Sequence, residues 1–363
     1  MRTVWFRRGA SSSGVLRPGR IARYGRFWLS IDVFGITVNT AFVLWYFLDD
    51  TFQVVVVFGY IAHLALPAAF IWLPFAILRR RRISIALGAA SLVAFVWLFG
   101  NGIVRSDPDP PPAGAAEVVV LTYNLGNGLA TPEKLIPVLR SSGADIIGLE
   151  EVTPETELAL SSGLADLYPY QALYGMGIPG KGLLSRYPIL QNELLELNPG
   201  RPDLRAIVDF DGMQITIIVA HPPPPGLRRT GIQPREGTAE QVDALIAIIE
   251  ETKGPLIVLG DFNVTRLHDA YRRLEDADLR DVYRLVGDGL GYTMPTRFAS
   301  LAESGSPLGD IPLPPVLRID YVWISRDWYP VDAWIAEKAG SDHRPVGARL
   351  AIQHELGTPE IVA

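Results

Sequence analysis

The sequence GSDHRP at Gly340–Pro345 decides the expected fold, together with two earlier stretches of the chain. GDFN at Gly260–Asn263 closes the apolar run Pro255–Leu259, and RIDY at Arg318–Tyr321 opens another apolar run. Two carboxylates, an amide and an Asp-His pair therefore lie at or beside the ends of expected strands. Side chains placed in this way converge to hold a metal ion and a reacting phosphate.

Charge is distributed unevenly along the 363 residues. Up to Pro112 there are 12 Lys and Arg against 5 Asp and Glu, a net charge of +7. The remainder has 21 against 34, a net charge of −13. An acidic downstream domain lacks the basic surface of a general nucleic-acid-binding protein. The absence of cysteine excludes disulfides, zinc–thiolate sites and a cysteine nucleophile.

Three apolar runs, Phe27–Leu48, Phe52–Leu78 and Ile83–Val104, precede this acidic part. Each has about 20 residues or more, the length that crosses a hydrocarbon core of roughly 30 Å. A buried helix of a soluble protein would be shorter or amphipathic. We therefore predict a multi-pass protein of the cell membrane with three spans.

Basic residues predict the orientation of these spans. Residues 1–26 are rich in arginine, and Arg79–Arg82 separate the second run from the third. The positive-inside rule places both segments in the cytoplasm, so the chain after the third span is extracytoplasmic. Residues 105–116 form a proline-rich linker. They are followed by an enzyme-like domain, 117–352, and a tail, 353–363.

The downstream domain combines expected strands with fewer helices. Asp211-Gly212 between two apolar runs indicates a β-hairpin. Both hairpins and helical crossovers occur, which suggests two packed sheets flanked by helices. The expected strands are 118–123, 145–149, 182–189, 206–210, 214–220, 256–259, 319–325 and 346–352, and the expected helices are 132–141 and 238–250.

Several side chains at these strand ends suit a magnesium site. Mg²⁺ prefers oxygen ligands, usually one or two carboxylates completed by water and phosphate. Glu150-Glu151 can supply one ligand, and only one of the pair can face the site because strand neighbours point to opposite faces. Asp342 can supply another, and the Asn124 amide can orient a ligand or a phosphate oxygen.

The remaining candidates suit phosphoryl chemistry. Asp261 and Asn263 can orient or deprotonate water and donate to the charge that develops on phosphorus. His343 beside Asp320 forms an oriented imidazole, and His221 is a second imidazole suited to the leaving group. Taken singly, each has a structural alternative, such as a turn cap or a buried histidine. Five such sites in order make that alternative weak.

The order of these motifs resembles the endonuclease/exonuclease/phosphatase superfamily, with the DNase I-like fold. The resemblance implies a four-layered α/β sandwich that hydrolyses phosphoesters with Mg²⁺ or Mn²⁺. It implies Glu151, Asn124 and Asp342 around the metal, and catalytic roles for His221, Asp261, Asn263, Asp320 and His343. The motifs are Thr122–Leu125 (TYNL), Ile147–Val152 (IGLEEV), Leu184–Ile189 (LSRYPI), Ala220-His221, Gly260–Asn263, Arg318–Tyr321 and Ser341–Pro345.

Three spans before such a domain are similar to the membrane-bound bacterial branch, which includes proteins associated with resistance to teicoplanin-type glycopeptides. That similarity implies hydrolysis of a phosphorylated lipid or lipid-linked wall intermediate, such as undecaprenyl pyrophosphate. Asn124, Asn263 and Arg228 are the expected phosphate contacts, and Arg229 and Lys181 are further cations. Solvation at the surface is the alternative for each of these three cations. Two other functions stay open: an extracellular Mg²⁺-dependent nuclease or phosphodiesterase, and an inactive membrane binding module.

Overall fold

The structure is a computed structural model that describes residues 18–48, 50, 52–103, 109–225 and 237–353. The chain divides into two compact units, one within Met1–Val43 and Ala62–Val96 and the other within Leu44–Ile61 and Trp97–Ala363. The second unit contains the downstream domain, which we call the α/β domain. It also contains a short piece of the apolar N-terminal region.

The apolar region is helical, as the sequence predicts. Two helices are long and apolar enough to cross a membrane, at Gly25–Leu48 and Arg82–Gly100. The expected span 52–78 consists of two helices bent by 63°, and the region has three candidate spans if this bent pair is one span. Pro67 lies at the break, where a proline lacks the N–H that a continuous helix needs. The helices are α1 (Pro18–Leu48), α2 (Gln53–Ala65), α3 (Ala69–Leu78) and α4 (Arg82–Ile103).

Polar side chains join the helices of the first unit. Asn39 Nδ2 in α1 donates to the Leu87 carbonyl oxygen (3.2 Å) and to Ser91 Oγ (2.9 Å), both in α4. Asp32 accepts a hydrogen bond from Ser84 Oγ at 2.5 Å and pairs with Arg81 at 3.4 Å. Such pairing satisfies polar groups in segments that are otherwise apolar.

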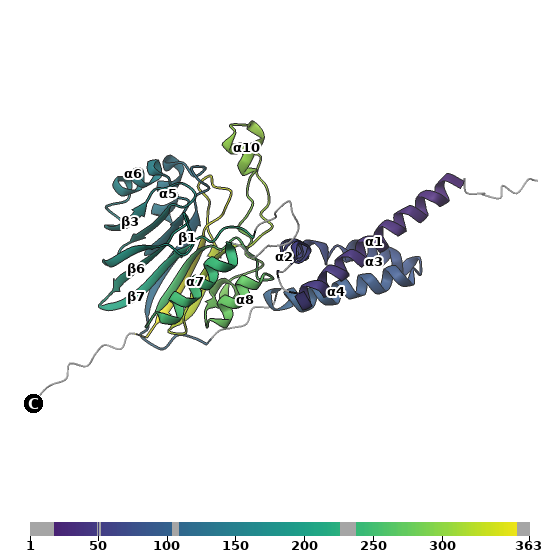
Figure 1. The fold of residues 1–363 in the computed structure, drawn as a ribbon, viewed down its shortest axis with the longest axis horizontal. Coiled ribbons are helices and arrows are strands. Elements are labelled where there is room, and N and C mark those ends of the chain that lie inside the picture. Colours follow the sequence, from purple (N-terminus) through teal and green to yellow (C-terminus); the bar gives the residue numbers. More distant parts are fainter. Residues whose placement is uncertain (1–17, 49, 51, 104–108, 226–236, 354–363) are drawn as a thin grey trace, which may run out of the picture. The chain divides into compact units, whose positions relative to one another are not determined.

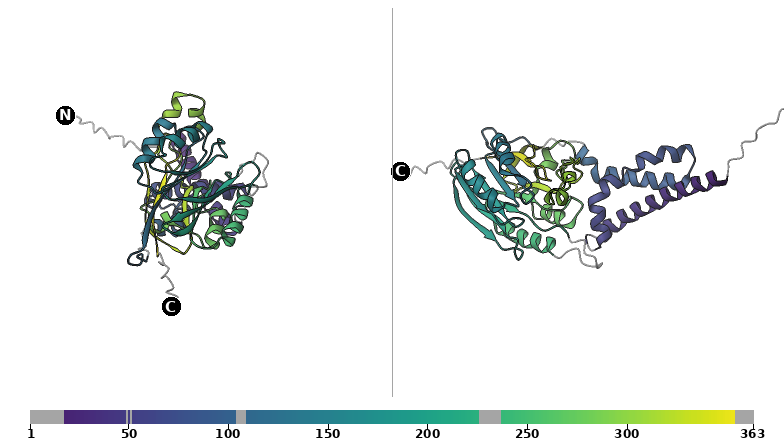
Figure 2. Two further views of the ribbon diagram at one scale, coloured as in Figure 1. Left: turned by 90° about the vertical axis from the view of Figure 1, so that its left-hand side faces the viewer. Right: turned by 90° about the horizontal axis from the view of Figure 1, so that it is seen from above.

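The α/β domain contains two six-stranded sheets that pack face to face (Figures 1 and 2). In the first, the strand order is β11-β12-β1-β2-β4-β3; in the second, it is β5-β6-β7-β8-β10-β9. The strands of the first sheet are β1 (Ala116–Asn124), β2 (Ile146–Glu150), β3 (Tyr170–Tyr174), β4 (Lys181–Ser185), β11 (Trp328–Ile335) and β12 (Val346–Ile352). The strands of the second are β5 (Ile189–Leu195), β6 (Asp203–Phe210), β7 (Met213–Ala220), β8 (Leu256–Asp261), β9 (Arg280–Asp281) and β10 (Asp320–Ile324).

Helices cover the outer face of each sheet (Figure 1). The expected helix 132–141 is confirmed, although Thr131 before it makes no side-chain cap hydrogen bond. Helix 238–250 is confirmed with one further residue. The helices are α5 (Pro132–Ser141) and α6 (Pro154–Gly163) on the first sheet, α7 (Thr238–Glu251) and α8 (Asp269–Asp276) on the second, and the short α9 (Val282–Val286), α10 (Ala299–Glu303) and η2 (Pro307–Asp310).

Three apolar clusters separate these four layers. Strand β1 illustrates the arrangement, because Val118 and Val120 point between the sheets while Leu121 and Tyr123 point to α5 and α6. This alternation follows from the period of two along a strand. A third cluster joins the second sheet to α7 and α8. The expected four-layered DNase I-like sandwich is therefore confirmed.

Two parallel strand pairs lie at the centre, one in each sheet. β1 pairs with β2 through the crossover that contains α5, and β7 pairs with β8 through the crossover that contains α7. Strands of a parallel pair run in the same direction, so their carboxyl ends meet at one edge. The expected hairpin at Asp211-Gly212 is confirmed between β6 and β7, with φ of 51° and 91° at the two turn residues.

Leu259→Ala tests the packing between the sheets. Leu259 is fully buried, and a Cβ on Gly148 in the other sheet would lie 2.9 Å from its Cδ1. Removal of the side chain leaves a cavity that costs about 2–5 kcal/mol. The thermal midpoint of the full-length protein in detergent should fall by at least about 4 °C. Leu190→Ala, at an exposed position of β5, is the control, with an expected shift of about 2 °C or less. Equal shifts would contradict the packing.

Candidate functional site

The carboxyl ends of the two parallel pairs bring four predicted site residues to one edge of the sandwich. Asn124 ends β1, Glu151 follows β2, His221 follows β7 and Asp261 ends β8. A Cβ on Gly260 would lie 1.9 Å from the Ala220 carbonyl oxygen, so only glycine allows β7 and β8 to approach this closely before Asp261.

Two antiparallel strands add the remaining acids and the second imidazole. Asp320 begins β10 and lies directly opposite Asp261 on β8. His343 precedes β12, and its Nδ1 lies 3.1 Å from both carboxylate oxygens of Asp320. The predicted Asp320–His343 pair is therefore present in the structure. The side chains of all three residues are buried.

Asn124 connects the two sheets at this edge. Its Nδ2 donates to Asp261 Oδ2 at 2.9 Å and lies 3.4 Å from Glu151 Oε1. Its Oδ1 accepts a hydrogen bond from the backbone N–H of Gly126 at 2.9 Å, which orients the amide. The Asn124 carbonyl oxygen accepts from Ser341 Oγ at 2.7 Å, so the loop that carries Asp342 is attached to the same residue.

The two predicted imidazoles both lie close to one oxygen of Asp261. His221 Nε2 is 3.7 Å from Asp261 Oδ2, and His343 Nε2 is 3.8 Å from the same oxygen. His221 Nε2 is also 3.8 Å from Glu151 Oε1. The structure thus places His221, His343, Asp261 and Glu151 within one small cluster.

The backbone after β2 directs the side chains of Glu150 and Glu151 to different surroundings. Glu150 is fully buried and accepts a hydrogen bond from Thr122 Oγ1 at 2.8 Å. Glu151 has a positive φ of 58°, which turns its side chain toward Asn124 and His221. A positive φ is unfavourable for a residue with a Cβ and is often found at functional sites. Glu151 is therefore the member of the pair that faces the predicted site.

Asn263 also has a positive φ, 54°. Its backbone N–H donates to Asp261 Oδ1 at 2.8 Å, so the two oxygens of Asp261 accept from Asn263 and Asn124. Its side-chain Nδ2 donates to the Pro222 carbonyl oxygen at 3.1 Å. The proline segment after His221 thus holds the amide of Asn263 beside the cluster.

Asp342 approaches from the loop before β12. A Cβ on Gly126 would lie 2.8 Å from Asp342 Oδ1, which places this carboxylate against the turn that follows Asn124. Its backbone carbonyl accepts a hydrogen bond from Thr296 N at 2.8 Å. Arg228, the predicted phosphate contact, lies outside the residues that the structure describes.

A group of three side chains in the described residues has the spacing to hold a metal ion. Asp261, Asp320 and His343 each offer one ligand atom, and these atoms lie within 4.8 Å of one another. Of the predicted metal ligands, Asn124 donates to Asp261 of this group and lies 3.4 Å from Glu151, and neither Glu151 nor Asp342 is one of its three members. The donor set consists of carboxylates, an amide and imidazole, and it fits a divalent cation that prefers oxygen.

The electrostatics agree with a site for positive charge. Burial raises the pKa of Asp261 to about 7, and the neighbouring carboxylate of Asp320 adds to the rise. Burial also raises the pKa of Glu151, and it raises that of Glu150 well above the usual value, helped by Asp320. Burial alone would lower the pKa of His343, but Asp320 and Asp261 raise it well above the usual value.

The pKa of the second imidazole, His221, shifts in the opposite direction. Burial lowers the pKa of His221 well below its usual value, and the cations Lys181 and Arg201 add to this effect. The two histidines of one cluster therefore favour different protonation states. Such a separation is typical of a site with distinct acid and base roles.

Lys181 and Arg201 are cations whose position the sequence did not indicate. The alternative of surface solvation is wrong for Lys181, because its side chain is fully buried opposite Glu150 and donates to the Pro179 carbonyl at 3.0 Å. Arg201 Nη1 is buried without a hydrogen-bond partner in the described part of the chain. The pairing of β4 with β2 places Lys181 opposite Glu150, and only the register of this pair reveals the position.

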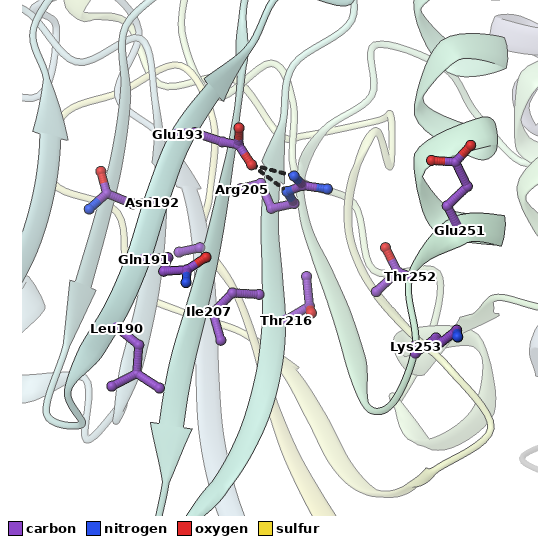
Figure 3. A pocket seen from close by; sticks show the side chains of 11 residues that line it. Leu190, Gln191, Asn192, Glu193, Arg205, Ile207, Thr216, Glu251, Thr252 and Lys253 are labelled. Carbon is purple, nitrogen blue, oxygen red and sulfur yellow. Dashed lines mark hydrogen bonds and ion pairs between the residues drawn. The ribbon is translucent and has the colours of Figure 1, made fainter.

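A separate pocket of about 800 Å³ lies on the outer surface of the second sheet, over β5, β6 and β7 (Figure 3). Its lining includes the ion pair between Glu193 and Arg205 and the end of α7 at Glu251. None of the predicted site residues lines it. The pocket is therefore distinct from the cluster around Asp261.

Comparisons with known proteins agree with this geometry. The family model described as "Endonuclease/Exonuclease/phosphatase family" matches residues 121–343. Among curated proteins, the search found no match. A family member from Bacteroides thetaiotaomicron is 17% identical with a TM-score of 0.51, over 66% of this chain and 99% of that one. D. rerio TDP2 complexed with single strand DNA product is 18% identical with a TM-score of 0.50, over 65% and 99%.

The chain belongs to the endonuclease/exonuclease/phosphatase family, since the family model spans the α/β domain from β1 to His343. Its class of activity is phosphoester hydrolysis. The structures named above share the fold, at identities too low to carry a substrate to this chain.

Asp320→Asn tests the electrostatic pairing within the cluster. The variant removes the negative charge that faces His343 Nδ1, so the pKa of His343 should fall. An NMR titration of the histidine ring protons, in chelator-treated full-length protein, measures this change. Asp332→Asn on β11 changes an exposed carboxylate and should leave the titration of His343 unaltered. An unchanged pKa in Asp320→Asn would contradict the pairing.

Proposed function

We propose that this protein is a membrane-anchored, metal-dependent phosphohydrolase whose catalytic domain lies on the extracytoplasmic side. Its substrate is a phosphorylated lipid or a lipid-linked cell-wall intermediate, with undecaprenyl pyrophosphate as the model compound. The observation that carries the proposal is the cluster of Asn124, Glu151, Asp261 and two imidazoles in a chain that begins with apolar helices.

Two observations support membrane anchoring and the extracytoplasmic position of the α/β domain. Two apolar helices, or three if the bent pair is one span, are long enough to cross a bilayer. The arginines before α1 and at Arg79–Arg82 favour the cytoplasmic side, which leaves the α/β domain outside. A domain tethered in this way meets substrates that are themselves held in the membrane.

The chemistry follows from the contacts of Asp261. Both of its oxygens accept hydrogen bonds, from the Asn263 N–H and the Asn124 amide, so the carboxylate is fixed in one orientation. Asp261 is thereby suited to orient and deprotonate the attacking water. His343, held by Asp320, directs Nε2 toward the same place and suits a phosphoryl oxygen. His221, whose Nε2 is 3.7 Å from Asp261 Oδ2, suits the leaving group.

A divalent cation, Mg²⁺ or Mn²⁺, would be held by Glu151, Asp342 and Asn124, where it would polarise the phosphoryl group and neutralise developing charge. The buried acids around Asp261 fit this role because several have a raised pKa without a cation. Lys181 and Arg201 provide positive charge beside His221 and are further candidates for the phosphate.

Activity on undecaprenyl pyrophosphate is the first test. Full-length protein in detergent with Mg²⁺ should release inorganic phosphate, and chelation should abolish the release. Asp261→Ala should reduce kcat by about 10²–10⁴-fold, the usual contribution of a general base. Plasmid DNA at low salt, in a nicking assay, is the competing substrate. Nicking without phosphate release from the lipid would replace this proposal with the nuclease alternative.

The metal assignment has its own test in the adjacent glutamates. Glu151→Gln removes the charge that faces the cluster, so the Mg²⁺ concentration for half-maximal activity should rise at least tenfold, on the order seen when a metal site loses a supporting group. Glu150→Gln is the matched control, because burial already favours the neutral form of this side chain. A larger metal effect in Glu150→Gln would reverse the assignment.

A further inference from the structure

The loop that follows β8 is attached to the N-terminal helical region. Residues 44–61 belong to the same compact unit as the α/β domain, although they lie in or between the helices α1 and α2. Their contacts gather on residues 263–269, which run from catalytic Asn263 to the start of α8. We call residues 44–61 the brace.

Two side chains of the loop bond to the backbone of α2. Thr265 Oγ1 donates to the Gly59 carbonyl oxygen at 2.8 Å, and His268 Nε2 lies 3.2 Å from the Val56 carbonyl oxygen. His268 Nδ1 accepts from the Thr265 N–H at 3.0 Å, so Nε2 carries the proton and donates. Burial lowers the pKa of His268 to about 4, which keeps this neutral form near pH 7.

Close approach of α2 depends on a glycine. A Cβ at Gly59 would lie between 2.8 and 3.2 Å from three atoms of the His268 ring. A side chain there would push the ring or the helix away. The backbone of α2 at Gly59 and the ring of His268 in the loop are thus closely packed.

Further contacts satisfy backbone groups of the loop. Trp45 Nε1 donates to the Leu267 carbonyl oxygen at 2.6 Å, and the Asp269 N–H donates to Asp50 Oδ2 at 2.7 Å. Asp269 is the first residue of α8, whose N-cap side chain, His268, makes no cap hydrogen bond. Asp50 therefore supplies the acceptor that the first turn of a helix needs.

The brace reaches a residue of the predicted catalytic set through Tyr60. The hydroxyl of Tyr60 donates to the Asn263 carbonyl oxygen at 2.6 Å. Asn263 has the positive φ of 54°, and its N–H and side chain bond to Asp261 and Pro222. A strained backbone persists only where its surroundings stabilise it. The hydrogen bond from Tyr60 stabilises the Asn263 backbone at its carbonyl group.

We propose that the brace is part of the active-site architecture, with Tyr60 as a positioning residue that acts through Asn263. The apolar N-terminal region then sets the geometry of the catalytic loop in addition to anchoring the chain. The activity readouts rest on the proposed phosphohydrolase function, whereas the cross-linking readout below needs no activity.

Cysteine cross-linking tests the contact itself, because the chain has no native cysteine. Asp50→Cys with Asp269→Cys should form a disulfide when membranes holding the full-length protein are treated with copper phenanthroline. Asp50→Cys with Asp276→Cys is the control, since Asp276 is at the other end of α8, roughly 10 Å away along the helix. Failure of the first pair, or equal yields from both, would overturn the brace whatever the enzyme's substrate.

Tyr60→Phe tests the positioning role. Loss of the hydroxyl removes one hydrogen bond, so kcat should fall about fivefold or more with KM nearly unchanged. Hydrolysis of bis(p-nitrophenyl) phosphate with Mn²⁺ by full-length protein supplies the rates. Tyr170→Phe, at an exposed tyrosine of β3 outside the brace, is the matched control and should keep wild-type kcat. Equal kcat in both variants would overturn the proposal.

A double-mutant cycle separates positioning from general stability. If Tyr60 acts through Asn263, Tyr60→Phe should not lower kcat further in an Asn263→Ala background. A full additional fivefold loss in that background would show that Tyr60 acts elsewhere, and would overturn its assignment as a positioning residue for Asn263.

Discussion

The hydrogen bond from Asn124 to Asp261 joins two sheets that share no strand, and the rest of the site depends on it. Asn124 ends β1 in the first sheet, and Asp261 ends β8 in the second. The bond forms only if the apolar layer between the sheets sets their separation and both parallel pairs end at the same edge. Each group that contacts Asp261 then follows from strand register, as when β10 places Asp320 opposite it.

Burial gives this cluster its chemical character. Carboxylates in a dry interior resist ionisation unless positive charge is near, and here imidazole, lysine and arginine supply part of it. The same burial gives the two histidines different protonation preferences. Backbone strain at Glu151 turns its side chain toward Asn124 and His221, and the strained residue Asn263 donates its backbone N–H to Asp261. This edge of the sandwich thus combines desolvation with strain that the packed sheets maintain.

Much of the fold could be predicted because its signals are local. A run of apolar, β-branched residues marks β1, the Asp211-Gly212 turn marks the hairpin of β6 and β7, and polar residues after apolar runs mark the strand ends. Elements with weak local signals, such as β3 and β11, depend on pairing with neighbours and were not predicted. The sequence does not predict the bend after α2, because apolarity alone does not distinguish a straight helix from a broken one.

The polar residues at the strand ends can be located from the sequence alone, because apolar runs and turn residues act over a few neighbours. The tertiary structure was needed to show that Glu151 contacts Asn124 and His221 while Glu150 bonds to Thr122, that Lys181 is fully buried, and that Tyr60 contacts Asn263. These outcomes depend on backbone strain, on the register between strands and on contacts across more than a hundred residues. Such contacts form only when the packed layers bring distant segments together.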